Sequence, residues 1–331
     1  MRGVALAVAA LAAVLAVPAW AEPLKLRISW ATTPSQITPM LSELPREVYR
    51  HWGKSYIVEP VFMAGSGTIL PALSAGELEI AGYSYQSYAL SVFAAKLDIK
   101  AFAGVFASKP PYADSGFWVK KSRIQKIEDL KGKNIAVNSR GSAVDASLHK
   151  MLADHGLKDQ RDYHIVEVRF PAMLPTLDAD KVAMAYLVLP FSLTAEANPD
   201  YKQMFTLTDA LGPNETVIYA AKTEFIRAHR DALVDFVEDN IRARRWLYDP
   251  ANRDAMIKLV AKVTKQPEQA FREWIFTTRD VYRDMNAAFD AALLQKNVDD
   301  LHKLGVTEQT FDVDKYSDLS LVHDAKTRFA Q

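Results

Sequence analysis

Short apolar strands alternate with helices along residues 24–221, and this alternation constrains the fold more than any other feature of the sequence. The strands are expected at residues 24–30, 57–62, 78–81, 102–107, 117–119, 135–137, 165–168, 182–189 and 217–221. Helices are expected from residue 33 or 38 to 52, and at residues 68–74, 85–95, 143–155 and 172–177. Strands and helices that alternate at this spacing favour parallel sheets with right-handed crossovers. The sequence therefore predicts an α/β protein.

The alternation falls into two series, and the second begins near Gly116. Residues 74–81 of the first series, SAGELEIA, weakly resemble residues 178–185 of the second, DADKVAMA, as expected for two similar lobes. Residues 223–304 have apolar side chains at helical spacing almost throughout and predict a helical cover over one lobe. At roughly 150 residues per domain, the chain is long enough for two domains.

The first 21 residues predict a secretory signal peptide that is cleaved after Ala21. Arg2 precedes an apolar run from residue 4 to 17, and small residues flank Trp20 before the expected cut. A membrane anchor is the alternative, but a run of about 14 residues is shorter than the roughly 20 needed to span a bilayer. We therefore expect an exported protein in the periplasm.

The absence of cysteine from the sequence excludes a lipid-modified N-terminal Cys, disulfides and thiolate metal sites. Without the signal peptide the chain has 310 residues, with 39 basic and 40 acidic side chains. A nearly neutral protein has no electrostatic footprint for nucleic acid or an anionic membrane. Recognition is therefore expected to be local, and no nucleic-acid partner is expected.

Three strand ends are followed by a turn rich in Ser, Thr or Gly that opens a helix, at residues 30–38, 65–68 and 138–142. Free backbone N–H groups and the helix dipole make such turns suitable for anions. Ligands of open α/β sheets bind at the carboxyl ends of the strands. The three turns together predict a cleft that binds a small anion.

The same turns have a structural alternative. Thr33 with Gln36, and Ser142 with Asp145, fit capping boxes that would satisfy these N–H groups internally. A helix N-terminus contributes only about 0.3–1 kcal/mol to anion binding, whereas micromolar affinity requires about 8 kcal/mol. Arg140 could add a charged contact if it points inward, and a solvent-facing orientation fits the sequence equally well.

Aromatic side chains near the same strand ends could bind the body of the ligand by stacking. They are Trp30, Tyr83, Tyr85, Tyr88, Tyr112, Trp118, Tyr186 and Phe191. We expect Tyr83 and Tyr186 to face the cleft from opposite lobes, and the alternative is that both are core residues. If both tyrosines face the cleft, the ligand is expected to have an aromatic or aliphatic body.

Enzyme and metal motifs are incomplete. The pattern S-x-x-K at residues 147–150 resembles that of penicillin-recognising acyl enzymes, but the companion motifs S-D-N and K-T-G are absent. The seven histidines form no H-E-x-x-H motif and have no clustered acidic ligands. We therefore expect no catalytic residues, no metal site and no cofactor.

Two segments resemble signatures of substrate-binding proteins of ABC importers, in the nitrate/sulfonate/taurine and thiamine-precursor-like group. Residues 127–137, IEDLKGKNIAV, followed by residues 139–142, SRGS, resemble the start of the second lobe in that family. Residues 73–82, LSAGELEIAG, resemble a first-lobe signature of the same group. The similarity extends over essentially the whole mature chain.

The resemblance implies a two-lobe periplasmic binding protein fold of type II, in which the lobes close on a small molecule. Each lobe would be a mixed, mostly parallel sheet flanked by helices, with a helical C-terminal tail on lobe one. We expect lobe one to comprise residues 22–114 and 219–331, and lobe two residues 115–218. The expected partners are a small anionic ligand and an ABC permease with its ATPase, and the protein is expected to be a monomer.

Matching positions imply ligand contacts in both lobes. The expected contact residues are Trp30, Gln36, Ser66, Gly67, Thr68, Tyr83, Ser84, Ser139, Arg140, Ser142, Tyr186 and Phe191. The family's second-lobe pattern G-x-V-D-A reads DKVAM at residues 180–184, so the sequence departs from the family just before Tyr186. The ligand class implied is a sulfonate or carboxylate, with either an aromatic or an aliphatic body, and nitrate and pyrimidines are also found in the group.

Two other functions remain open at this point. A ligand-sensing partner of a membrane receptor would use the same pocket. A pyrimidine-precursor binder or synthase-like enzyme belongs to a related branch, whose chemistry depends on cysteine and histidine. The absence of cysteine and the predicted export argue against that enzyme.

Overall fold

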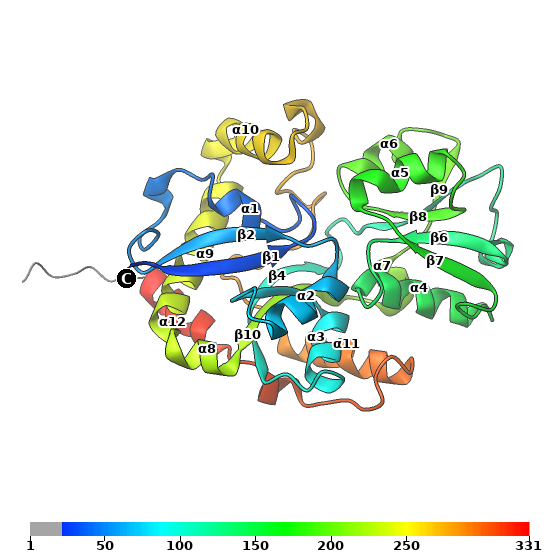
Figure 1. The fold of residues 1–331 in the computed structure, drawn as a ribbon. Coiled ribbons are helices and arrows are strands. Elements are labelled where there is room, and N and C mark those ends of the chain that lie inside the picture. Colours follow the sequence, from blue (N-terminus) through cyan, green and yellow to red (C-terminus); the bar gives the residue numbers. More distant parts are fainter. Residues whose placement is uncertain (1–21, 331) are drawn as a thin grey trace, which may run out of the picture.

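The computed structural model describes residues 22–330 and contains two mixed sheets with helices packed around each (Figure 1). In Figure 1 the elements from β5 to α7 lie together on the right, and the remaining elements lie on the left. The predicted signal peptide and its cleavage site after Ala21 lie outside the described residues. Between residues 22 and 330, no helix is both long and apolar enough to cross a membrane.

A two-stranded sheet and a three-stranded sheet, joined by one isolated bridge, together form what we call the first sheet, and they combine strands from both ends of the chain. Its strands are β1 (Leu24–Trp30), β2 (Tyr56–Phe62), β3 (Ala81–Ser84), β4 (Ile99–Ser108) and β10 (Asn214–Lys222). β1 is parallel to β2, and β10 lies between β3 and β4 and is antiparallel to both. A bridge between Ile28 and Ile80 joins β1 to the segment that leads into β3. The chain therefore leaves this sheet after β4 and returns to it through β10.

The second sheet has five strands in the order β7-β6-β8-β5-β9. They are β5 (Gly116–Lys120), β6 (Lys133–Val137), β7 (Tyr163–Glu167), β8 (Met184–Leu187) and β9 (Tyr201–Thr206). β6 is parallel to β7 and β8, whereas β5 is antiparallel to β8 and β9. In the second sheet, β6 lies between β7 and β8. In the first sheet, β1 pairs with β2 on one side and is joined on the other side to the segment that leads into β3. The predicted α/β class with mixed sheets is confirmed.

Twelve α-helices are described between residues 22 and 330. They are α1 (Thr38–Leu41), α2 (Ser66–Ser74), α3 (Tyr85–Phe93), α4 (Ala143–Asp154), α5 (Phe170–Asp178), α6 (Phe191–Glu196), α7 (Leu207–Leu211), α8 (Thr223–Ala228), α9 (Arg230–Tyr248), α10 (Arg253–Thr264), α11 (Ala291–Lys303) and α12 (Ser320–Phe329). Apolar residues of α9, α10 and α12 share one core cluster with the first sheet. A separate cluster lies within residues 117–207. The C-terminal helices therefore cover the first sheet.

The long helix expected from residue 33 or 38 to 52 is not observed. The structure has only α1 and a 3₁₀ turn at Arg46–Val48 in this region. Pro45 separates them, because proline has no N–H and disfavours helix at the residue before it. The N–H groups of residues 50, 51 and 52 donate instead to the buried carboxylate of Asp239 on α9, at 2.8–3.0 Å. A distant side chain thus replaces the predicted helical bonds.

The prediction of nearly continuous helix over residues 223–304 is wrong between α10 and α11. Residues 265–290 form turns with one 3₁₀ segment, Glu268–Ala270. Lys265 ends α10 in the left-handed conformation, and Pro267 follows it. The Arg253 guanidinium then donates to the carbonyls of Ile275 and Arg272, both at 2.6 Å. Side-chain bonds therefore support this segment without a regular helix.

Candidate ligand-binding cleft

A cavity of about 240 Å³ lies where the two sheets face each other. The carboxyl ends of β1 and β2 supply one side, and the starts of α5 and α6, which follow β7 and β8, supply the other. The last turn of α10 and the residues after it form a third wall. The lining residues are Trp30, Ala31, Thr32, Thr33, Phe62, Ala64, Arg169, Phe170, Pro171, Pro190, Phe191, Val263, Thr264 and Gln266. This is the strand edge at which the sequence predicts a ligand.

Aromatic rings dominate the wall of the cavity. Trp30 and Phe62 meet edge to face with ring centroids 5.0 Å apart. Phe62 is 45% exposed, which is unusual for so large an apolar side chain. Phe170, the first residue of α5, and Phe191, the first residue of α6, line the cavity from the other side. Four rings from two sides of the cavity therefore surround a space that an apolar or aromatic body can fill.

Arg169 is the only lining residue of the described cavity that carries a formal charge. It is exposed and immediately precedes α5, and its guanidinium lies 5.7 Å from the centroid of the Phe62 ring. Within residues 22–330, no hydrogen bond or ion pair of this guanidinium is observed. Its five N–H donors are therefore available to an anion. The sequence analysis missed Arg169, although its position just after the strand predicted at residues 165–168 was a usable signal.

Gln36 stabilises the first turn of the cavity wall. This buried side chain accepts hydrogen bonds from the N–H groups of Ala31 and Thr32, at 2.6 and 3.0 Å, through Oε1. The two N–H groups that the sequence suggested for an anion are therefore satisfied within the protein. Gln36 thus shapes the wall beside Trp30.

The fully buried Arg283 side chain also stabilises the turn at residues 30–38 by hydrogen bonds. Its Nε donates to the carbonyl of Ser35 at 3.1 Å, and one terminal nitrogen donates to the carbonyl of Pro34 at 3.0 Å. Asp280 pairs with the guanidinium at 2.9 Å and balances its charge. These bonds restrict the movement of the wall that carries Trp30, so the cavity is preorganised on this side.

In the turn at residues 138–142, carboxylates bind two of the backbone N–H groups. The N–H of Arg140 donates to Oε1 of Glu167 at 2.5 Å, and the N–H of Gly141 donates to Oδ2 of Asp145 at 2.9 Å. The Ser142 hydroxyl accepts from the N–H of Asp145 at 3.3 Å and so caps α4. Ser142 therefore caps α4 as the structural alternative predicts, but the reciprocal bond of a capping box is not observed, because the Asp145 carboxylate accepts from Gly141.

The Arg140 guanidinium pairs with Asp159 at 2.8 Å. This hydrogen bond raises the pKa of Arg140, although burial alone would lower it. A guanidinium that already has a carboxylate partner gains less from a ligand anion than a free one. The structure therefore gives the two arginines different environments. Of these two, only Arg169 lines the cavity and has no hydrogen bond or ion pair from its guanidinium within residues 22–330.

Several other predicted contact residues meet where the two sheets approach beside the cavity. Ser84 caps α3 by accepting from the N–H of Ser87, and Ser87 donates through its hydroxyl to the carbonyl of Gly141 at 2.6 Å. Ser139 is buried next to Gly65 and donates to the carbonyl of Arg140 at 2.9 Å. The second and third predicted turns, at residues 65–68 and 138–142, thus lie against each other.

Three further predicted residues, Thr68, Tyr83 and Tyr186, are not among the described residues that line the cavity. Thr68 donates to the carbonyl of Gly65 at 2.8 Å within the first turn of α2, which begins with Ser66 and Gly67. Tyr83 is fully buried among residues of α3 and α11. Tyr186 is buried against Phe117 and Phe170, with ring centroids 5.1 and 6.3 Å away. Tyr186 therefore supports the Phe170 ring from behind, and direct ligand contact by either tyrosine stays a prediction.

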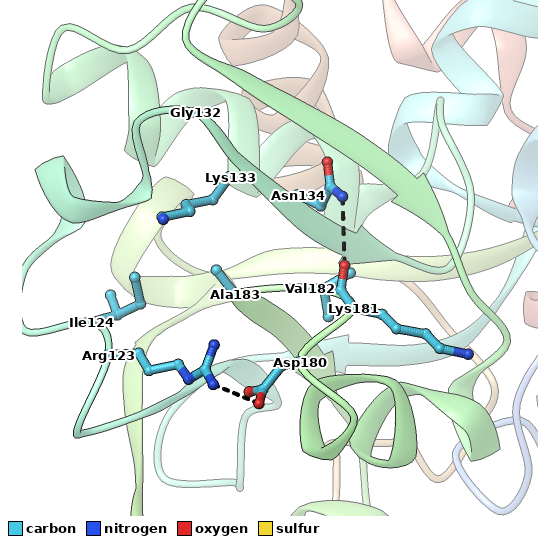
Figure 2. A pocket seen from close by; sticks show the side chains of 9 residues that line it. All are labelled: Arg123, Ile124, Gly132, Lys133, Asn134, Asp180, Lys181, Val182 and Ala183. Atoms are coloured by element: carbon cyan, nitrogen blue, oxygen red, sulfur yellow. Dashed lines mark hydrogen bonds and ion pairs between the residues drawn. The ribbon is translucent and has the colours of Figure 1, made fainter.

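A second hollow, of about 440 Å³, lies at the opposite edge of the second sheet (Figure 2). It is found at the amino ends of β6 and β8. Arg123 in this hollow pairs with Asp180 at 2.6 Å, and Lys133 and Lys181 point away from each other. Because its cations do not converge, this hollow is a weaker candidate for anion binding than the cavity between the sheets.

His149, on α4, is expected to make the protein more stable at low pH than at high pH. Its Nε2 lies 3.3 Å from Oδ1 of Asp145, and its Nδ1 lies 2.9 Å from the Tyr163 hydroxyl. Burial alone lowers the pKa of His149, but the hydrogen bond and charge of Asp145 raise the pKa above its ordinary value. This stabilisation is fully present below the unfolded pKa of about 6.5 and is lost as the pH rises through the folded pKa.

We therefore expect His149→Gln to lower the free energy of unfolding more at about pH 5.5 than at about pH 8.5, by about 0.5 kcal/mol. Urea denaturation of both proteins at the two pH values measures this difference. An equal loss at both would show that the Asp145 contact does not favour the charged imidazole.

Comparison with protein families gives a match to the NMT1/THI5-like model over residues 57–252. The chain belongs to the NMT1/THI5-like family. This is the thiamine-precursor-like group that the two sequence signatures resemble, so that prediction is confirmed. None of the curated proteins compared with the chain matches it.

Solved structures with similar folds include binding proteins and one enzyme. An alkanesulfonate-binding protein from Xanthomonas axonopodis pv. citri, bound to MOPS, is 19% identical with a TM-score of 0.69, over 90% of this chain and 99% of that chain. The periplasmic nitrate-binding protein from Synechocystis PCC 6803 is 13% identical with a TM-score of 0.71, over 93% of this chain and 89% of that chain. The desulfurization enzyme DSZB is 16% identical with a TM-score of 0.62, over 92% and 99%. At these identities the likeness shows the fold, and the predicted periplasmic binding protein fold is confirmed.

Proposed function

We propose that this NMT1/THI5-like protein is the substrate-binding component of an ABC importer and captures a small organic anion, a sulfonate or carboxylate. The observation that carries the proposal is the unpaired guanidinium of Arg169 in a cavity otherwise lined by uncharged residues. A planar guanidinium matches the oxygens of a sulfonate or carboxylate in a bidentate contact. The alkanesulfonate- and nitrate-binding neighbours with this fold bind anions, which supports the same ligand chemistry here.

The body of the proposed ligand is apolar and preferably aromatic. Trp30 and Phe191, both predicted as contacts, line the cavity with Phe62 and Phe170. A small inorganic anion would leave these rings in contact with water, whereas a ring or short alkyl chain would cover them. The proposed ligand therefore has a charged end at Arg169 and an apolar end among the rings.

Capture is proposed to involve closure of two lobes, residues 22–114 with 219–331 and residues 115–218. The chain crosses between the two sheets after β4 and again before β10, and two such crossings allow a hinge. We propose that the protein acts in the periplasm as a monomer, without metal or cofactor, and delivers its ligand to a permease and its ATPase. The contribution of both sheets to one cavity supports this arrangement.

Binding without catalysis fits the residues of the cavity better than an enzyme function. No Asp, Glu, His, Lys or Tyr is among the described residues that line it. General acid–base catalysis requires such a group near the reacting atoms, and the hydroxyls of Thr32, Thr33 and Thr264 have no adjacent base in that lining. The enzyme among the structural neighbours shows that the fold does not decide this question, so the lining residues carry the argument.

Isothermal titration calorimetry with benzenesulfonate and the neutral benzenesulfonamide tests the charge and the ring together. We expect benzenesulfonate to bind about 10- to 100-fold more tightly, because a hydrogen bond to a charged group contributes about 1.5–3 kcal/mol. Nitrate, which has the charge without the ring, is expected to bind more weakly than benzenesulfonate. Equal affinity for the sulfonate and the sulfonamide would contradict an anion site.

A further inference from the structure

Gly65 lies where the two proposed lobes approach each other closely. A Cβ atom at this position would be 2.2 Å from Cβ of Ser139 and 2.9 Å from Nδ2 of Asn138. Carbon atoms in ordinary contact are about 3.5–4.0 Å apart. The Gly65 backbone has φ of −178°, an extended conformation that any residue adopts. Glycine is therefore required here by the neighbouring lobe and not by the local backbone.

The opposing turn is held in place and cannot easily move aside. Ser139 lies two residues after the end of β6 and is buried, and the next two N–H groups of its turn donate to Glu167 and Asp145. The nearest atom to the added Cβ is a Cβ attached to the backbone and not the far end of a flexible side chain. A clash at this point must therefore be relieved by separation of the lobes.

The contact continues from Gly65 along α3 and α4. The Ser87 hydroxyl at the start of α3 donates to the carbonyl of Gly141 in the opposite lobe at 2.6 Å. Ala143 and Ala146 of α4 are buried in the same cluster as Tyr85 and other residues of α3. The small side chains permit this approach, and the cavity opens directly beside it, because Ala64 lines the cavity and precedes Gly65.

We propose that Gly65 determines how closely the two lobes approach, and so makes closure over the ligand possible. The proposal rests on the proposed function, because it concerns closure of the same cleft. Any side chain at position 65 would separate the lobes by at least about 1 Å at this contact. The Ser87–Gly141 hydrogen bond and the burial of Ala143 and Ala146 depend on the same approach. A side chain at residue 65 therefore favours an open form without disturbing either lobe.

A distance measurement between the lobes tests the proposal directly. The chain has no cysteine of its own. Glu47→Cys in lobe one and Lys121→Cys in lobe two therefore provide one exposed site for a spin label in each lobe. In the unliganded protein we expect Gly65→Ala to lengthen the distance between the labels. If the closed form falls to one tenth of the molecules, the affinity for benzenesulfonate falls about tenfold, since only the closed form binds tightly.

The matched variant is Gly65→Ala combined with Ser139→Gly, which removes the Cβ that the new methyl group meets. We expect this pair to shift the distance and the affinity back toward the wild-type values, while Ser139→Gly alone keeps the wild-type distance. A wild-type distance in Gly65→Ala overturns the proposal, and so does weaker binding without a longer distance. The distance does not depend on a ligand, so it tests Gly65 even if the wild-type protein fails to bind benzenesulfonate and the proposed function is wrong.

Discussion

Replacing Arg169 with Gln is expected to weaken binding of benzenesulfonate by about 100-fold. The substitution removes a charge-assisted bidentate contact, for which about 3 kcal/mol is the upper end of the usual range. Arg169 is exposed and has no ion-pair partner among residues 22–330, so its loss should leave the thermal midpoint of unfolding unchanged. Calorimetric titration of wild type and variant measures the loss.

Two arginines provide controls for this result. Arg227→Gln removes the same charge from an exposed position on α8, away from the cavity, and should leave the affinity unchanged. Arg140→Gln removes a guanidinium that already pairs with Asp159, and should weaken binding much less than Arg169→Gln. If Arg140→Gln had the larger effect, the charged end of the ligand would lie at the turn of residues 138–142 instead.

Replacing Glu215 with Gln is expected to raise the free energy of unfolding by about 3 kcal/mol at about pH 8. Glu215 lies near the start of β10, where the chain returns to the first sheet, and is 3% exposed. Burial raises the pKa of Glu215 to about 7, although the hydrogen bond from the N–H of Asp290 opposes this shift. The carboxyl group therefore binds its proton more tightly in the folded chain than in the unfolded chain, where its pKa is about 4.3.

The sign of the pH dependence follows from this difference. Between about pH 4.3 and 7 the folded protein holds the proton that the unfolded chain has lost, so stability falls as the pH rises through this window. Above it the full cost of the buried carboxylate is present. Glutamine keeps the oxygen that accepts from Asp290, at 3.1 Å in the wild type, and carries no charge at any pH.

Chemical denaturation at about pH 4.5 and pH 8 measures the effect of Glu215→Gln. We expect the variant to be close to wild type at the lower pH and more stable at the higher one. Glu224→Gln, at an exposed position on α8, is the matched control and should change neither value. The same gain at both pH values would show that the stabilisation comes from packing and not from removal of a buried charge.

Much of the secondary structure could be predicted from local patterns. The strand expected at residues 24–30 is observed there as β1, because alternating apolar residues need only one buried face. The capping of α4 by Ser142 was also visible as a local alternative. The helix expected to end at residue 52 failed because Asp239, almost 190 positions away, binds the N–H groups that would have continued it. The sequence around residues 50–52 does not indicate that their N–H groups bind this distant carboxylate.

The candidate site, like the secondary structure, could be predicted from the sequence only in part. The sequence alone determined the α/β class, the strand edge at which the candidate cavity lies, and two residues that line the cavity there, Trp30 and Phe191. Only the tertiary structure decided which polar groups remain available to a ligand. Glu167 and Asp145 bind two donors of one predicted turn, Gln36 binds two donors of another, and within residues 22–330 the Arg169 guanidinium has no hydrogen bond or ion pair. The physical reason is that hydrogen-bond satisfaction depends on side chains that meet only after the chain has folded.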